Sequence, residues 1–202
     1  MSKDEQIRRL MRQIALNDSN IIWLDSKQDI DVPTDRKSLL SAAIFDQARE
    51  HHKSIMVLFK LRYFGSGLAL VRPLFESYLR GLWIQRCADE REIKKFIKSK
   101  DIKPVQYLID RIEKTAGFES GILSASKKSI WHAACGFTHS GFEQASRRLS
   151  EDDIGPNYDL DEIIQSMKAV LAYDFMTFLA MCELGSNNEL ANEVLERFRL
   201  SN

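Results

Sequence analysis

The segment from Leu68 to Cys87 constrains the fold more than any other part of the chain. On a helix, its apolar side chains cover most of the circumference, and a single line of charges, Arg72, Glu76 and Arg80, interrupts them. Such a helix is stable in water only when other elements surround it, because its apolar surface has to be buried. The segment therefore predicts the central helix of a larger assembly.

Apolar residues recur at helical spacing through nearly all of the remaining sequence. Only 9 Gly and 4 Pro interrupt the 202 residues, so long helices joined by short loops are expected. The pattern predicts helices over residues 3–16, 34–63, 67–87, 89–100, 104–117, 126–149 and 159–185, and a last one from 188. The predicted fold is an all-α, single-domain bundle of about seven to eight helices.

We divide this single domain, residues 1–202, into three parts. Residues 1–33 form an N-terminal helix and a polar connection, residues 34–185 form the core bundle, and residues 186–202 form a C-terminal amphipathic helix. Inside the core bundle, Gly65-Ser66-Gly67 predicts a turn. Pro73 predicts a kink that frees the carbonyl of Ala69, because proline has no N–H and its ring presses on the carbonyl four residues back.

The balance of charges limits the class of function. The chain has 29 Lys and Arg against 29 Asp and Glu, whereas a dedicated nucleic-acid module is usually strongly basic. The charge is polarised, since residues 1–100 carry 19 basic and 13 acidic side chains and residues 53–100 alone carry 11 and 4. The sequence thus predicts one positive face beside the 68–87 helix on a molecule that is neutral overall.

Cysteine usage and hydropathy indicate a cytoplasmic protein. The three cysteines are widely spaced and contain no Cys-x-x-Cys pair, which argues against a disulfide framework and against a cysteine-based zinc site. The N-terminus lacks the apolar core of a secretion signal. The longest apolar stretch, residues 169–182, is interrupted by Asp174 and is shorter than the ~20 residues of a membrane span. We expect no membrane partner.

The first candidate site is the line formed by Arg72, Glu76 and Arg80. Each lies four positions after the last, so all three project from one side of the helix. Because an unpaired buried charge is very costly, these groups have to be paired internally or face a cleft. The line is either a self-paired triad that fixes helix register, a cleft in which forked guanidinium groups bind an anion and Glu76 orients them, or a solvent-exposed face.

The second candidate site lies on the predicted helix over residues 126–149. His132, His139, Glu143 and Arg147 project from one side if that helix is continuous, and such a set can supply general acid–base chemistry. His139 is the hypothetical acid or base, and Gly136 on the same side permits a close approach of backbone or ligand. The alternative is a histidine that bonds across the bundle beside a solvated face.

No metal site or cofactor motif is predicted. The adjacent His51 and His52 point in different directions on a helix, and neither a His-x-x-x-His nor a Glu-x-x-His pattern occurs. Gly65-Ser66-Gly67 lacks the other residues of a phosphate-binding loop. We therefore expect no cofactor and no metal.

Two resemblances follow from these motifs. The Arg-Pro-x-Phe-Glu run at residues 72–76 and the Phe-Thr-His-x-Gly run at 137–141 resemble an uncharacterised family of bacterial proteins, a domain of unknown function. The resemblance implies that Arg72, Glu76, Arg80, His139 and Arg147 act as one unit. A weaker resemblance is to HEPN-type helical bundles, many of them dimeric ribonucleases of toxin or phage-defence systems, although their Arg-x(4–6)-His signature is absent here.

Three functions are compatible with the sequence. The first is a binding or regulatory bundle, expected as a homodimer, whose Arg/Glu/His cleft recognises a small anionic or nucleotide-like ligand. The second is a metal-independent ribonuclease-like toxin or phage-defence effector acting on RNA, with His139 as the acid–base group. The third is a structural protein–protein interaction module that pairs through its amphipathic end helices.

Overall fold

The computed structural model describes residues 2–27, 29–100, 102–139, 141–149 and 153–201, without the side chains of Ile130, His132 and Ala133. Ten helices and no strand occur within these residues. They are α1 (Lys3–Asp25), α2 (Arg36–Lys60), α3 (Phe64–Ala69), α4 (Val71–Arg86), α5 (Glu90–Ile97), α6 (Val105–Ile112), α7 (Ile122–Thr138), α8 (Phe142–Ser146), α9 (Leu160–Leu184) and α10 (Asn188–Leu200). The prediction of an all-α bundle is confirmed.

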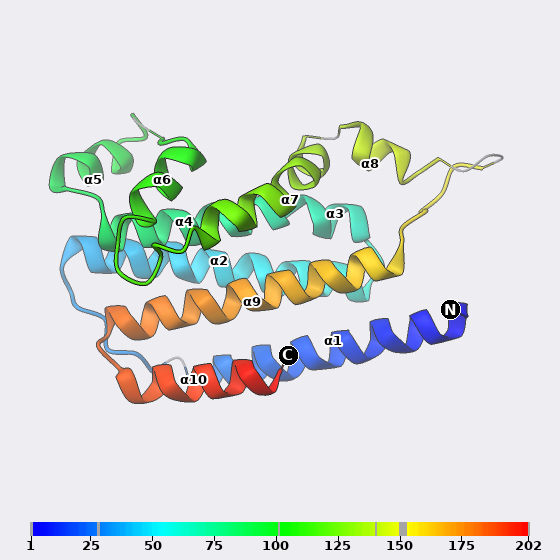
Figure 1. Cartoon of the computed structure of the whole chain (residues 1–202), viewed down its shortest axis with the longest axis horizontal. Helices are drawn as coiled ribbons and strands as arrows, with labels where there is room; N and C mark the ends of the chain where they lie inside the picture. The colour runs from blue at the N-terminus through cyan, green and yellow to red at the C-terminus, as the bar shows by residue number, and fades with distance from the viewer. Residues whose placement is uncertain (1, 28, 101, 140, 150–152, 202) are drawn as a thin grey trace.

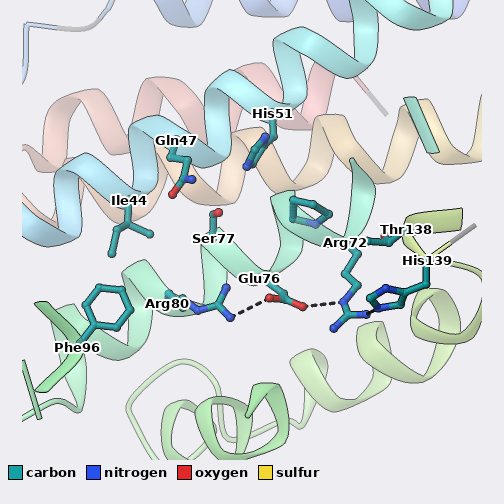
Figure 2. A pocket seen from close by; sticks show the side chains of 11 residues that line it. Ile44, Gln47, His51, Arg72, Glu76, Ser77, Arg80, Phe96, Thr138 and His139 are labelled. Atoms are coloured by element: carbon teal, nitrogen blue, oxygen red, sulfur yellow. Dashed lines mark hydrogen bonds and ion pairs between the residues drawn. The ribbon is translucent and has the colours of Figure 1, made fainter. Parts of the chain in front are cut away.

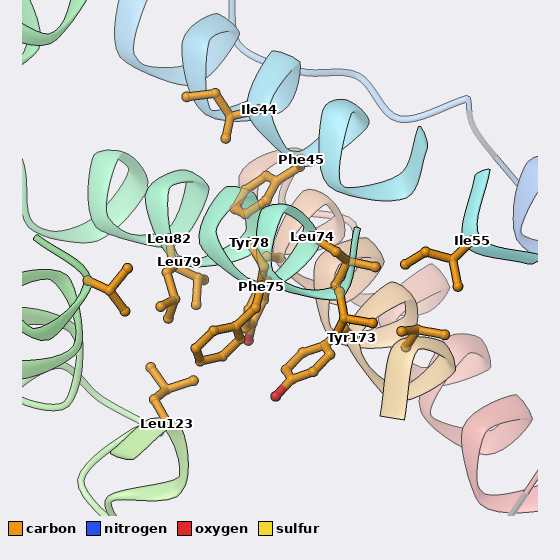
Figure 3. Packing of buried hydrophobic residues seen from close by; sticks show 14 of the residues in the cluster. Ile44, Phe45, Ile55, Leu74, Phe75, Tyr78, Leu79, Leu82, Leu123 and Tyr173 are labelled. Carbon is orange, nitrogen blue, oxygen red and sulfur yellow. The ribbon is translucent and has the colours of Figure 1, made fainter. Parts of the chain in front are cut away.

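Helix α4 is the central helix that its sequence predicts. It contacts α2, α6, α7 and α9, and ten of its side chains are buried. Figure 1 shows α2 and α9 side by side in the middle, with α1 and α10 along one side and α5 to α8 along the other. Figure 3 shows Phe75 and Tyr78 of α4 packed among Phe45 of α2 and Tyr173 of α9. The apolar circumference of α4 is thus covered from several sides.

The predicted polar connection over residues 17–33 is wrong in its first part, because α1 continues to Asp25. Asn17 and Asn20 do not end the helix. Their side chains are buried and donate to the carbonyls of Gln13 and Leu16, one turn earlier, at 2.9 Å each. Polar residues that satisfy their hydrogen bonds on the same helix can face the core without breaking it.

The predicted helix over residues 67–87 is divided at Leu70. Residues 65–67 form part of the short helix α3, so the predicted turn is wrong. A Cβ atom on Gly67 would overlap the ring of Phe59, and the close packing there keeps this segment helical against α2. Pro73 lies in the first turn of α4, and the Ala69 carbonyl accepts from Thr138 Oγ1 at 3.0 Å. The expected freeing of this carbonyl is confirmed.

The predicted single helix over residues 126–149 is also divided. Helix α7 ends at Thr138 and α8 begins at Phe142, with Gly141 in an extended conformation between them. The chain folds back so that the Glu143 side chain lies over Gly136, where a Cβ atom would overlap the carboxylate. The close approach expected at Gly136 therefore comes from Glu143, made possible by the break.

Helix α9 has the start that its sequence predicts, with Asp159 as N-cap accepting from the N–H of Asp161 at 2.8 Å. Among the described helices, α9 is the one whose length and composition would allow it to cross a membrane. The sequence prediction considered only residues 169–182, which are too few for a membrane span. The window that meets this test is 61% buried inside the protein and contains the buried Asp174. This is the burial of a core helix.

A charged network that the sequence did not predict lies inside the bundle. Arg49 of α2 donates through Nε to Asp174 at 3.0 Å, and His52 Nδ1 lies 3.0 Å from the other oxygen of the same carboxylate. Asn17 of α1 meets His52 Nε2 at 3.2 Å. Burial alone would raise the pKa of Asp174, but His52 and Arg49 outweigh it and hold the pKa below its usual value. The network ties α1, α2 and α9 together.

Candidate functional site

A cavity of about 330 Å³ lies between α2, α4, α5 and the C-terminal end of α7. Its walls combine charged, neutral polar and apolar side chains (Figure 2). The lining residues are Ile44, Gln47, His51, Arg72, Pro73, Glu76, Ser77, Arg80, Phe96, Thr138 and His139. Four of the residues proposed from sequence, Arg72, Glu76, Arg80 and His139, meet here.

Glu76 bridges the two arginines of the central helix. Arg72 Nε donates to one carboxylate oxygen at 2.7 Å, and the terminal nitrogen NH2 of Arg80 donates to the other at 2.8 Å. Their side chains are 23%, 16% and 22% exposed for Arg72, Glu76 and Arg80, so the line is neither sealed in the core nor fully solvated. It is a half-buried ion-pair network that opens into the cavity.

The pKa shifts in this line follow from the pairing. Burial alone would raise the pKa of Glu76, but the hydrogen bonds from Arg72 and Arg80 lower it below its usual value. The hydrogen bond to Glu76 raises the pKa of Arg72. At neutral pH the line therefore holds two positive charges and one negative charge.

Arg72 also connects α4 to α7. Its NH1 nitrogen lies 2.6 Å from His139 Nε2 and donates to Cys135 Sγ at 3.4 Å, and its guanidinium lies 4.7 Å from the centre of the Trp131 ring. Because arginine stays protonated and has no acceptor, His139 Nε2 is the acceptor in this contact. His139 is itself exposed to solvent.

Local sequence explains why His139 reaches Arg72. Thr138, the last residue of α7, donates its hydroxyl to the Ala69 carbonyl that Pro73 leaves without a helical partner. The next residue, His139, ends the helix and is thereby held beside the first turn of α4. The Arg-Pro and Thr-His motifs are thus joined in space by one hydrogen bond.

Glu143 and Arg147 of the second predicted site do not line the cavity. Arg147 pairs with Glu162 of α9 at 2.6 Å, and Glu143 packs over Gly136. The side chain of His132 lies outside the described residues. The predicted single line of four side chains is wrong because α7 ends before residue 139, so α8 points its residues in a different direction.

Sequence reasoning missed one wall of the cavity, which α2 provides. Ile44, Gln47 and His51 follow each other at helical spacing and line the cavity opposite α4 (Figure 2). Burial lowers the pKa of His51, which favours its neutral form, although the nearby Glu50 acts in the opposite direction. The spacing of these three residues was visible in the sequence, but only their place opposite Arg72 and Arg80 marks them as site residues.

No group of three or more His, Cys, Asp or Glu side chains suited to a metal ion occurs among the described residues. The cysteines with described surroundings, Cys87, Cys135 and Cys182, are free. What the site offers chemically is therefore cationic hydrogen-bond donors, one bridging carboxylate, two histidines and neutral polar groups.

The family model DUF6988, described as a family of unknown function, matches residues 45–199. The matched range contains α4, α7 and part of α2, and so it includes ten of the eleven cavity-lining residues. No curated protein and no solved structure matches the chain.

Proposed function

This chain belongs to the DUF6988 family, a family of unknown function, and we propose that it is a binding module for a small anionic ligand. The ligand occupies the cavity between α2 and α4, and its anionic group is held by Arg72 and Arg80. Family membership agrees with the resemblance to an uncharacterised family and brings no activity with it, so the proposal rests on the geometry of the site.

The proposal rests on the guanidinium N–H groups of Arg72 and Arg80 that have no hydrogen-bond partner among the described residues. Glu76 takes Nε of Arg72 and NH2 of Arg80. Within the described part of the chain, no hydrogen bond involves NH2 of Arg72 or Nε and NH1 of Arg80. Guanidinium N–H groups without a protein partner can make single, charge-assisted hydrogen bonds to the oxygens of phosphate and carboxylate groups.

The charge balance of the line also favours an anion. One carboxylate cannot neutralise two arginines, so the half-buried line carries a net positive charge. Water screens this charge less in a cavity than on an open surface. At the same time, the bridging Glu76 fixes both side chains, which reduces the entropy lost when a ligand binds.

The proposal is tested by titrating the whole protein with inorganic phosphate, sulfate and small dicarboxylates, followed by calorimetry and thermal unfolding. We expect at least one anion to bind and raise the melting temperature, and R80A to weaken that binding about tenfold or more. The matched control is R12A, which removes the same charge from the exposed face of α1. Equal affinities of wild type, R80A and R12A would contradict the proposal.

A second candidate function is a metal-independent ribonuclease, with His139 as acid or base and Arg72 and Arg80 stabilising charge. The contact between Arg72 and His139 favours it, because it places a histidine beside a phosphate-binding group. Arg147 does not contribute, since it pairs with Glu162 away from the cavity. This candidate predicts RNA cleavage that H139A abolishes, and intact RNA with wild-type protein rules it out.

The burial of several apolar side chains of the end helices disfavours the structural-module alternative, although Ile22 of α1 and Leu200 of α10 are exposed. The side chains buried inside this chain include Leu10, Leu24, Leu190 and Val194. The homodimer and the cytoplasmic location expected from the sequence are kept as proposals. Light scattering on the purified protein tests the first, and cell fractionation tests the second.

A further inference from the structure

We infer that the anionic ligand is a mononucleotide, a phosphate monoester that carries a planar heterocyclic base. The inference rests on the proposed function and adds a role for the part of the cavity that α2 and Phe96 line. The phosphate lies at the arginines of α4, and the base lies against the wall formed by α2 and Phe96 of α5.

The hydroxyl of Ser77 is available to a ligand in the cavity. Ser77 of α4 lines the cavity and is only 6% exposed, yet none of the described residues forms a hydrogen bond with its Oγ. Figure 2 shows the Ser77 oxygen directed toward the α2 wall, between Gln47 and Glu76. A hydroxyl that opens into a cavity and has no protein partner is available to a polar group of a ligand.

Helix α2 contributes a pair of neutral polar side chains to the cavity. Gln47 and His51 are four residues apart, project from one side of the helix and line the cavity across from Ser77. Within the described residues neither side chain has a hydrogen-bond partner. An amide, a neutral imidazole and a hydroxyl both donate and accept hydrogen bonds, which suits the mixed donor–acceptor edge of a nucleobase.

An apolar surface lies beside these polar groups. Ile44, Pro73 and Phe96 line the same cavity, and Figure 2 shows Phe96 at the end occupied by Arg80. A planar base stacks on an aromatic ring and on a guanidinium plane. A sugar or a simple dicarboxylate would leave this flank without an apolar partner.

The size of the cavity limits the ligand to one nucleotide. Its volume of about 330 Å³ is near the lower end of the roughly 300–1,000 Å³ found for small-molecule sites. Arg72 and Arg80 are separated by eight helical positions, or about 12 Å along the axis. The site therefore has room for a phosphate at the arginine wall and one base beside it, but not for a folded or stacked oligonucleotide.

The test is a calorimetric comparison of inorganic phosphate, ribose 5-phosphate, adenosine and the four nucleoside monophosphates on the full chain. We expect at least one nucleoside monophosphate to bind about tenfold or more tightly than ribose 5-phosphate, because stacking adds to the phosphate contact. S77A and Q47L should each weaken nucleotide binding about fivefold and leave ribose 5-phosphate binding unchanged. S166A makes the same serine-to-alanine change on α9, outside this cavity, and should alter neither.

The outcomes separate the inference from the proposed function. If nucleotides bind no more tightly than ribose 5-phosphate, the mononucleotide inference is wrong while the anion site stands. If no phosphate compound binds to folded wild-type protein, the proposed function fails and the inference fails with it. Because alanine is a good helix former, S77A should keep its fold, and its circular dichroism and melting temperature verify this.

Discussion

The hydroxyl of Thr138 lies 3.0 Å from the carbonyl oxygen of Ala69 and joins the end of α7 to the break between α3 and α4. The same hydroxyl lies 2.7 Å from the carbonyl of Ala134 in its own helix. Since Pro73 has no N–H, Thr138 is the side chain that meets the Ala69 carbonyl in place of the missing helical donor. This contact positions His139 beside Arg72 and so completes the candidate site.

The first prediction concerns this contact. T138V keeps the shape of the side chain but removes the donor, so we expect a loss of roughly 1 kcal/mol in the free energy of unfolding. The His139 ring should also become less firmly held beside Arg72. Urea denaturation measures the first effect, and the NMR shifts of the His139 ring measure the second.

A double-mutant cycle provides the control for T138V. P73A gives the Ala69 carbonyl a possible helical donor, so T138V should cost less in the P73A background than in the wild type. Equal costs in the two backgrounds would show that the Thr138–Ala69 contact does not contribute to stability.

The second prediction tests whether Arg72, Glu76 and Arg80 bind a ligand or only stabilise the fold. E76Q removes the negative charge that competes with a ligand for Arg72 and Arg80, so phosphate affinity should rise by roughly threefold to tenfold. The unfolding free energy should fall by about 1–2 kcal/mol, because glutamine has one acceptor oxygen and its NH2 group cannot accept from the second arginine. The control is E183Q, which removes the carboxylate that pairs with Arg86 outside the cavity. Lower stability without any change in phosphate affinity would mean that the line only fixes helix register.

The third prediction concerns the buried network of Asp174. D174N removes the buried carboxylate that pairs with Arg49 and His52 and leaves Arg49 with the partly exposed Asp25, so we expect a loss of about 3 kcal/mol in unfolding free energy. D161N breaks the half-exposed pair with Arg9 and should cost less than about 1 kcal/mol. Similar losses for the two variants in denaturant titrations would contradict the role assigned to burial.

The fourth prediction is a fall in stability with acid in two steps. Burial lowers the pKa of His51 below its value of about 6.5 in unfolded chains, so stability begins to fall below about pH 6.5. The pKa values of Asp174 and Glu76 are also lower in the folded state, and their contributions are present above about pH 4 and lost as the pH falls through the folded values. H51Q should remove the first step and D174N should reduce the second, as measured by urea denaturation across this pH range.

Helical periodicity was sufficient to predict the fold class, the central place of α4 and the bounds of α9. These features depend on which face of a helix is apolar, and that information is local. The Arg72–Glu76–Arg80 line was predictable for the same reason, since residues four apart on one helix are neighbours wherever the helix packs. The freed carbonyl of Ala69 followed from the chemistry of Pro73 alone.

The remaining site features depend on contacts between segments far apart in the sequence. The break between α7 and α8 separates Arg147 from His139, and the extension of α1 depends on hydrogen bonds that Asn17 and Asn20 make while facing other helices. The sequence by itself determined which faces are buried and which charges share a helix. Only the tertiary structure decided what lies opposite Arg72 and Arg80, namely His139 and the α2 wall. The reason is that packing between helices depends on the whole set of side chains rather than on the periodicity of one helix.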